Sequence, residues 1–167
     1  MNVIHFTSCP DDPGDQTLRQ KAASVKDIND RVRELVAGMR ALMVKDKGVG
    51  LAAPQVGMLQ RVFVTHADGD EFRVFINPSV LWTSQEQAVY EEGCLSLPGI
   101  WAEVVRPRAI KIQAWNEKGR AFTLDASGIL ARVIQHEYDH LQGVLFIDRV
   151  DQARRDKLLA KIAKAKK

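Results

Sequence analysis

The stretch ILARVIQHEYDH, from Ile129 to His140, combines a helical apolar repeat with side chains that bind metal ions. Positions 129, 133, 136, 137 and 140 share one face of a helix, which predicts a buried face on a helix over about 126–141 that stops at Gly143. His136 and His140 are four residues apart, so both imidazoles can reach one ion. Glu137 is then placed to handle the protons of a water on that ion. The alternative is a pair of core histidines satisfied by hydrogen bonds.

A third ligand is available in the segment EEGCLSLPG, from Glu91 to Gly99. Gly93 and the Pro98-Gly99 pair predict an irregular segment with exposed backbone around Cys94. A free cysteine considered alone is most often a small buried hydrophobe. Together with the two histidines, however, Cys94 completes a three-ligand set with an open fourth position, which suits zinc or ferrous iron.

Composition predicts one soluble domain over residues 1–167. The chain is 46% hydrophobic and 27% charged, which is ordinary for a globular protein of this length. It has no run near the ~18 apolar residues of a membrane span, and its first residues lack the features of a secretory signal. Two cysteines cannot make a disulfide framework. We therefore expect a cytoplasmic protein with no membrane partner.

The rest of the chain predicts short strands packed around the helix over about 126–141. Residues 1–23 are expected to be an irregular lead-in, and Ser24 or Asp27 can cap a helix that runs to about Lys45. Strands are expected at 61–65, 73–76 and 103–105, and a hairpin at 109–115 and 121–124. The fold class is therefore α+β, with mainly antiparallel strands around a central metal-binding helix and further helices near the two termini.

Three sequence blocks carry a resemblance to a known family. Gly48–Gln55 (GVGLAAPQ), Glu92–Ser96 (EGCLS) and Gln135–His140 (QHEYDH) resemble the three signature motifs of peptide deformylases, in the family's order. A weaker match at Thr17–Ala22 (TLRQKA) extends the resemblance over nearly the whole chain. The family removes the formyl group from the initiator methionine of nascent chains. The resemblance therefore implies a metal-dependent hydrolase that acts on formyl-Met peptides as a monomer, with no DNA partner.

The resemblance also implies a role for each site residue. Cys94, His136 and His140 would bind one divalent ion, which is expected to be Fe²⁺, with Zn²⁺, Ni²⁺ or Co²⁺ as alternatives. Glu137 would act as general base and then as general acid. The side-chain amide of Gln55 and the backbone N–H of Leu95 would donate hydrogen bonds to the formyl oxygen; Gln55 taken alone reads as an ordinary polar loop residue.

Substrate contacts follow from the same resemblance. The expected lining of the methionine pocket and of the backbone path comprises Val49, Gly50, Tyr90, Gly93, Ile129 and Val133. The four apolar residues of this set would also serve as plain core residues. Glu92 and Arg108 resemble an ion pair that steadies the cysteine segment from outside the ligand set. Asp139 is expected to brace nearby backbone and to have no catalytic role.

The segment 151–167 is strongly basic and has apolar residues at helical spacing. Its basic residues are Arg154, Arg155, Lys157, Lys161, Lys164, Lys166 and Lys167, and its apolar stripe comprises Leu158, Leu159, Ile162 and Ala165. A solvated amphipathic terminal helix accounts for this pattern. The alternative, which resemblance to ribosome-binding deformylases supports, is a basic helix that contacts ribosomal RNA.

The sequence departs from the family pattern at two places, and two other classes of function remain open. The lead-in Ser8–Gln16 is longer and more acidic than usual in the family, and Trp101 stands where an arginine or tyrosine is more familiar. A zinc peptidase with an H-E-x-x-H motif would draw its third ligand from elsewhere, and the candidates are Asp139, Asp148, Asp151 and Asp156. A non-enzymatic RNA-binding module would depend on the basic tail alone.

Overall fold

The computed structural model describes residues 1–164, whose strands form two antiparallel sheets. A five-stranded sheet has the order β1-β2-β3-β6-β7, and β4 pairs with β5 in a separate two-stranded sheet. The helices are α1 (Pro13–Leu18), α2 (Asp30–Lys45), α3 (Gly128–His140) and α4 (Gln152–Lys164), with short 3-10 turns η1 (Ala53–Val56) and η2 (Phe146–Asp148). The strands are β1 (Gly50–Ala52), β2 (Val62–Thr65), β3 (Arg73–Thr83), β4 (Gln87–Cys94), β5 (Leu97–Pro107), β6 (Ala109–Trp115) and β7 (Ala121–Ser127). The α+β fold class is confirmed.

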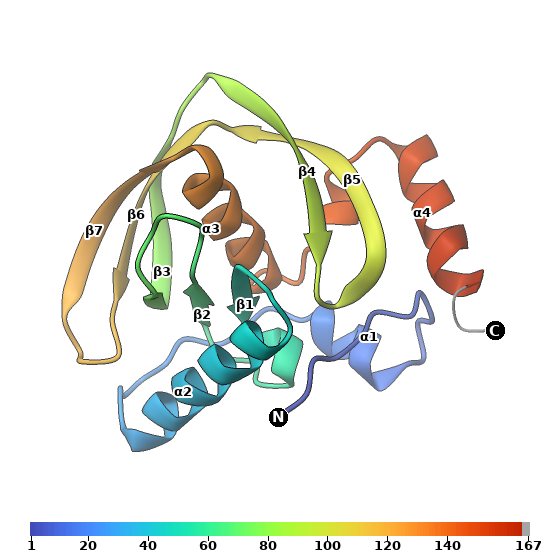
Figure 1. Cartoon of the computed structure of the whole chain (residues 1–167). Helices are drawn as coiled ribbons and strands as arrows, with labels where there is room; N and C mark the ends of the chain where they lie inside the picture. Colours follow the sequence, from blue (N-terminus) through green and yellow to red (C-terminus); the bar gives the residue numbers. More distant parts are fainter. Residues whose placement is uncertain (165–167) are drawn as a thin grey trace.

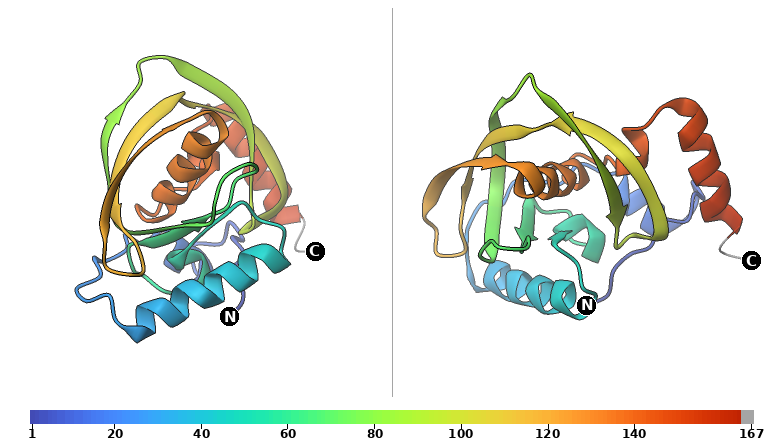
Figure 2. Two further views of the ribbon diagram at one scale, coloured as in Figure 1. Left: turned by 60° about the vertical axis from the view of Figure 1, so that its left-hand side comes forward. Right: turned by 45° about the horizontal axis from the view of Figure 1, so that its top comes forward.

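Helix α3 lies at the centre of the molecule, with β6 and β7 on one side and the β4–β5 hairpin on the other (Figures 1 and 2). Ala131 and Ile134 are fully buried in the core cluster that α3 shares with the five-stranded sheet. The chain leaves the helix at His140, and Gly143 adopts the expected left-handed conformation with φ 73°. The central helix therefore forms close to the bounds that its apolar repeat predicts.

Helix α2 begins later than the sequence suggested. Its N-cap is Asn29, whose side chain accepts a hydrogen bond from the Val32 N–H at 3.3 Å, so the expected caps Ser24 and Asp27 are wrong. The preceding chain cannot be helical because the Asn77 side chain bonds both the N–H and the C=O of Val25, each at 2.8 Å. This long-range pair of hydrogen bonds outweighs the local capping preference.

The lead-in is more ordered than expected. Its short helix α1 begins after Asp12, whose side chain accepts hydrogen bonds from Gly14 and Asp15. The buried Asp15 carboxylate in turn accepts from the N–H groups of Thr7 and Cys9, at 2.6 and 2.8 Å. The extra length of this segment is therefore folded around one buried acid.

The hairpin of β4 and β5 differs most from the prediction. Only residues 103–105 were expected to be extended here, but β4 and β5 pair from Gln87↔Pro107 to Cys94↔Leu97. The expected irregularity near Cys94 is reduced to a register shift between Gly93 and Cys94. β3 likewise continues past Ile76 to Thr83, with a register shift at residues 76–79 and a positive φ of 50° at Asn77.

Helix α4 docks against the hairpin. Ile162 is buried, and Leu158 and Leu159 pack against the same cluster, which includes Leu97 and Ile100 of β5. Residues 165–167, which include the expected stripe residue Ala165 and the basic residues Lys166 and Lys167, lie outside the described residues. Among the helices of residues 1–164, none is long and apolar enough to cross a membrane.

Candidate metal centre and cleft

A cleft of about 500 Å³ separates the β4–β5 hairpin from α3 and from the segment before β1. Its lining includes Gly48, Val49, Gly50, Gln55, Tyr90, Gly93, Cys94, Leu95, Trp101, Ile129, Val133, His136 and Glu137. The expected substrate residues therefore surround one cavity. Val133 is buried, whereas Val49 and Ile129 are 45% and 50% exposed at its rim, so neither of these two is a plain core residue.

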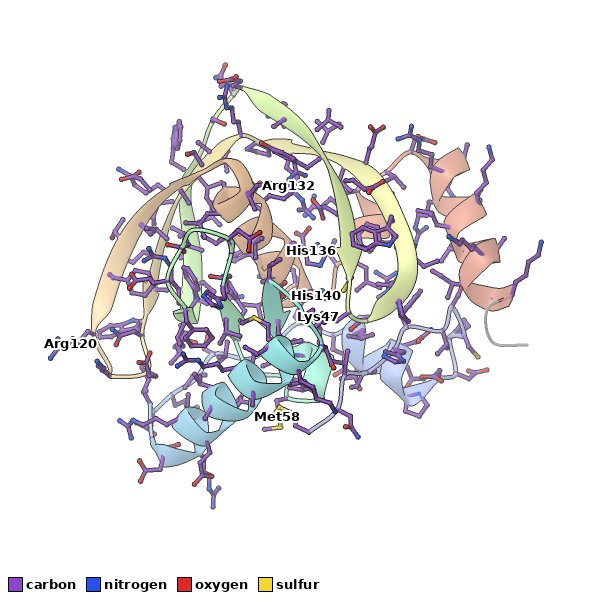
Figure 3. The ribbon with its side chains drawn as sticks, in the orientation of Figure 1. Lys47, Met58, Arg120, Arg132, His136 and His140 are labelled. Carbon is purple, nitrogen blue, oxygen red and sulfur yellow. The ribbon has the colours of Figure 1, made fainter. Side chains whose placement is uncertain are left out.

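Three ligand-type side chains meet at the inner end of this cleft. Cys94 ends β4, and His136 and His140 lie one turn apart on α3, at the centre of the molecule (Figure 3). Their ligand atoms all lie within 4.8 Å of one another, and Cys94 Sγ is 3.3 Å from His140 Nε2. Both histidines are buried, and Cys94 is half-buried.

His136 is oriented by Glu92. Its Nδ1 lies 2.9 Å from Glu92 Oε2, which leaves the other ring nitrogen to face the cysteine and the second histidine. Burial alone would raise the pKa of the Glu92 carboxyl, but hydrogen bonds from His136 and Arg106 outweigh it and hold the pKa well below its usual range. Glu92 is therefore a buried carboxylate that fixes one histidine ring.

The expected ion pair between Glu92 and Arg108 is wrong. Arg106 instead donates two hydrogen bonds to Glu92, at 2.7 and 3.0 Å, and Arg132 of α3 donates a third at 2.7 Å. Arg108 follows the end of β5 and points to solvent, where it pairs with Glu86 at 2.5 Å. Because β5 carries Arg106 on its inner face, this arginine reaches the buried carboxylate and Arg108 does not.

Asp139 braces arginine side chains rather than backbone. Its carboxylate accepts a 2.6 Å hydrogen bond from Arg106 and two hydrogen bonds from Arg149, at 2.5 and 3.0 Å. The charges therefore alternate from Arg149 through Asp139 and Arg106 to Glu92. This network joins α3 to the hairpin beside the candidate metal site.

Glu137 occupies the wall of the cleft between α3 and β1. A Cβ built on Gly50 would lie 2.8 Å from Glu137 Cγ, which is closer than van der Waals contact. Only a glycine at position 50 therefore leaves room for the Glu137 side chain. Burial raises the pKa of Glu137 to about 7, and its Oε2 has no hydrogen-bond partner within residues 1–164. A buried carboxyl poised near neutrality beside a metal-ligand set is suited to exchange protons.

Gln55 is held in one orientation by its surroundings. It is 1% exposed, and its Oε1 accepts a hydrogen bond from the Ala52 N–H at 2.8 Å. This contact turns the Nε2 donor toward Cys94 Sγ at 3.4 Å and Ser96 Oγ at 3.2 Å. Gln55 is therefore no ordinary loop residue: its amide N–H groups point toward the metal-ligating cysteine, and Leu95 lines the cleft next to them.

Sequence reasoning missed Arg106, Arg132 and Ser96. Arg132 could have been found, because it lies four residues before His136 and a charged residue on that buried helix face requires a partner. Its partners are Glu92, the Val104 C=O at 2.9 Å and the Ala88 C=O at 2.7 Å, all on the hairpin. Arg106 carried no local signal, whereas Ser96 belongs to the EGCLS block and was given no role of its own.

The donor set fits a divalent metal ion. One cysteine sulfur and two imidazoles converge with no fourth protein ligand in the described part of the chain, and this mixed soft set is typical of zinc and ferrous iron. The aspartates that a zinc peptidase would recruit are engaged elsewhere. Asp148 pairs with Arg19 and Arg155, and Asp139 pairs with Arg106.

Comparison with known proteins agrees with this geometry. The family model for polypeptide deformylase matches residues 11–156. The chain is 58% identical to peptide deformylase 1 of Clostridium perfringens, over 80% of this chain and 91% of that protein. It is 48% identical to the peptide deformylase of Treponema pallidum, over 90% of this chain and 92% of that protein.

A solved structure shows the same fold. The crystal structure of a peptide deformylase from Legionella pneumophila superimposes with a TM-score of 0.88 at 33% identity, covering 99% of this chain and 94% of that one. Family model, sequence relatives and fold therefore agree over nearly the whole chain, and they confirm that the protein is a hydrolase. On these grounds the chain belongs to the peptide deformylase family.

Proposed function

We propose that the cleft hydrolyses the formyl group from the N-terminal methionine of newly made peptides and releases formate. The observation that supports this most directly is the meeting of Cys94, His136 and His140 with the buried Glu137 at the inner end of an apolar cleft. Such a site can hold an apolar side chain of the substrate in the cleft and a small hydrolysable group of the substrate at the ion. The membership in the deformylase family supplies the substrate class.

Cys94, His136 and His140 would hold the ion. When bound, it supplies Lewis-acid chemistry by polarising a carbonyl oxygen and acidifying water. We infer Fe²⁺, by resemblance and because a thiolate with two imidazoles suits it, as it also suits Zn²⁺. Metal analysis of protein purified without air, followed by activity of the ion-free protein reloaded with Fe²⁺ or Zn²⁺, tests the choice. If the protein holds about one zinc ion per chain whether it is purified with or without air, the assignment of Fe²⁺ is contradicted.

Glu137 is proposed as the group that takes a proton from the attacking water and returns it to the departing amine. Its Oε2 is buried and has no hydrogen-bond partner in the described chain, so it is free to accept one. Its neighbour Gly50 leaves no side chain between the carboxylate and the cleft. Glu137 Oε2 is thus the atom at which we expect the proton to reside during the reaction.

Gln55 is proposed to donate to the formyl oxygen as negative charge develops on it. The hydrogen bond from Ala52 N–H to Oε1 fixes the amide plane, and donation to the formyl oxygen would replace one of the two bonds that Nε2 makes to Cys94 Sγ and Ser96 Oγ. The backbone N–H of Leu95, next to Cys94 at the tip of the hairpin, is proposed as the second donor. Both donors belong to segments adjoining the metal-ligand set, which is the arrangement that charge stabilisation requires.

The methionine side chain is proposed to enter between Tyr90 and α3. Val133 forms the buried wall, and Val49 and Ile129 form the rim. β4 pairs only with β5 among the described strands, so its other edge is free for the peptide backbone to pair along Gly93. Gly50 faces this path across the cleft.

Formate release from formyl-Met-Ala-Ser is the direct test. We expect hydrolysis of the formyl bond with the Met-Ala and Ala-Ser bonds intact, as measured by mass spectrometry of the products. Cleavage of an internal bond, or no formate from metal-loaded protein, would contradict the proposal. Acetyl-Met-Ala-Ser is a matched control. It differs from the formyl peptide only by one methyl group, and that group would have to fit beside the ion.

We also propose that the exposed basic side chains of α4 contact ribosomal RNA. Arg154 is 56% exposed, Lys157 is exposed, and the opposite face of the helix is docked through Ile162. Replacing Arg154 and Lys157 by Glu should weaken co-sedimentation with ribosomes and leave hydrolysis of short peptides unchanged. Lys118→Glu with Arg120→Glu, on the distant β6–β7 turn, is the control. Equal co-sedimentation of both double variants would contradict this idea.

A further inference from the structure

The outer face of the β4–β5 hairpin carries one large aromatic side chain, Trp101. Its register partner across the hairpin is Gly93. A Cβ built on Gly93 would lie 2.6, 2.7 and 2.8 Å from three atoms of the Trp101 six-membered ring. The indole therefore lies directly on the glycine backbone, and this contact fixes the ring across β4 toward its free edge.

Trp101 belongs to the cleft although it sits on the outer face. It lines the same cavity as Gly93, Cys94 and His136, and it is 60% exposed. The free edge of β4 is the one along which a peptide backbone would pair. An exposed ring held at that edge presents an apolar surface continuous with the substrate path.

Strand alternation decides which peptide residue meets this ring. Tyr90 and Glu92 point toward α3, where Arg132 contacts both of them, so Gly93 lies on the opposite face of β4. A peptide strand added to β4 alternates between the same two faces. With the methionine side chain on the α3 face, the next residue of the peptide falls on the face of Trp101.

We propose that Trp101 is a specificity-determining residue that favours an aromatic or large apolar side chain directly after the formyl-methionine. The inference rests on the proposed function, because it assumes a formylated peptide paired along β4. The indole already packs on the Gly93 backbone, so stacking uses a ring that is in place before the peptide binds. For a partly exposed aromatic pair we expect a preference of about two- to tenfold in kcat/KM over alanine.

The test compares formyl-Met-Phe-Ser with formyl-Met-Ala-Ser and measures the ratio of their kcat/KM values. Using the ratio within each protein cancels any change in overall activity or metal content. The ratio should be about two to ten in the native protein, fall to about one in Trp101→Ala, and recover in part in Trp101→Phe. Trp82→Ala is the matched control, because Trp82 is 54% exposed on β3 and lies outside the cleft lining.

Three results would overturn the proposal. They are a native ratio near one, a ratio that survives Trp101→Ala, and a preference found only with formyl-Met-Ala-Phe, which would place the ring opposite the third residue. If instead neither peptide releases formate, the proposed function itself fails. The two failures are therefore distinguishable in one set of assays.

Discussion

Replacing Arg106 by Leu should destabilise the protein strongly, while the same change at Arg108 should not. Arg106 is 4% exposed and donates three hydrogen bonds to buried carboxylates, two to Glu92 at 2.7 and 3.0 Å and one to Asp139 at 2.6 Å. Leucine replaces the aliphatic stem and removes the charge. The substitution therefore isolates the electrostatic role of the arginine in joining the hairpin to α3.

The magnitude follows from the partners that remain. Removing one member of a buried ion pair typically destabilises a protein by about 3–5 kcal/mol. Glu92 keeps Arg132, and Asp139 keeps Arg149, so neither carboxylate is left without a cation. We therefore expect a loss of stability at the lower end of this range, about 3 kcal/mol. For a chain of this size, that loss corresponds to a fall in Tm of about 6–12 °C.

Thermal and urea unfolding of the two variants, prepared in parallel, measure this difference. Arg108 pairs with Glu86 at the surface, where water screens the pair, so Arg108→Leu should unfold at the native Tm. Metal content should also fall in Arg106→Leu when ion is limiting, because Glu92 orients His136. A native Tm for Arg106→Leu, or a larger loss for Arg108→Leu, would refute the assignment of Arg106 as the partner of Glu92.

Three further predictions concern the site. Cys94→Ala should lose metal and activity together, as measured by metal analysis and formate release, and an active variant with stoichiometric metal would rule out Cys94 as a ligand. Glu137→Gln should keep its metal but lose about 10²–10⁴ in kcat; loss of metal would instead make Glu137 a ligand. Gly50→Ala should also keep its metal, yet lose about 10² in kcat because the new methyl group displaces the Glu137 carboxylate. Native turnover in this variant would show that the position of that carboxylate is not critical.

The central helix could be predicted because its signals are local. The apolar repeat and the spacing of the two histidines both depend on the 3.6-residue period of a single helix, so α3 forms where expected. The meeting of Cys94 with that helix could not be obtained from periodicity. It was inferred from the thiol in a glycine-flanked segment taken together with the two histidines, and the resemblance carried by three motifs then supported it. Helical spacing therefore predicted two of the three candidate ligands, and the chemistry of the thiol together with the family resemblance predicted the third.

The wrong predictions concern residues whose interaction partners lie far away in the chain. Arg106 and Arg108 are two residues apart and equally basic, and only the end of β5 at Pro107 separates an inward side chain from an outward one. The start of α2 was misjudged because Asn77, more than forty positions later, holds Val25 in an extended conformation. Neither contact has a signature in the neighbouring sequence.

The hairpin that carries Cys94 is the part of the fold whose attachment depends most on the site itself. β4 and β5 form no ladder with the five-stranded sheet in the part of the chain that the structure describes. The hairpin is held instead by its packing on α4 and by ion pairs with α3, in which Glu92 meets Arg132 and Arg106 meets Asp139. An ion bound to Cys94 on the hairpin and to His136 on α3 would tie the same two units together. Because ligand binding to the folded state adds to stability, we expect the ion to contribute to holding the hairpin closed on α3 as well as to the reaction.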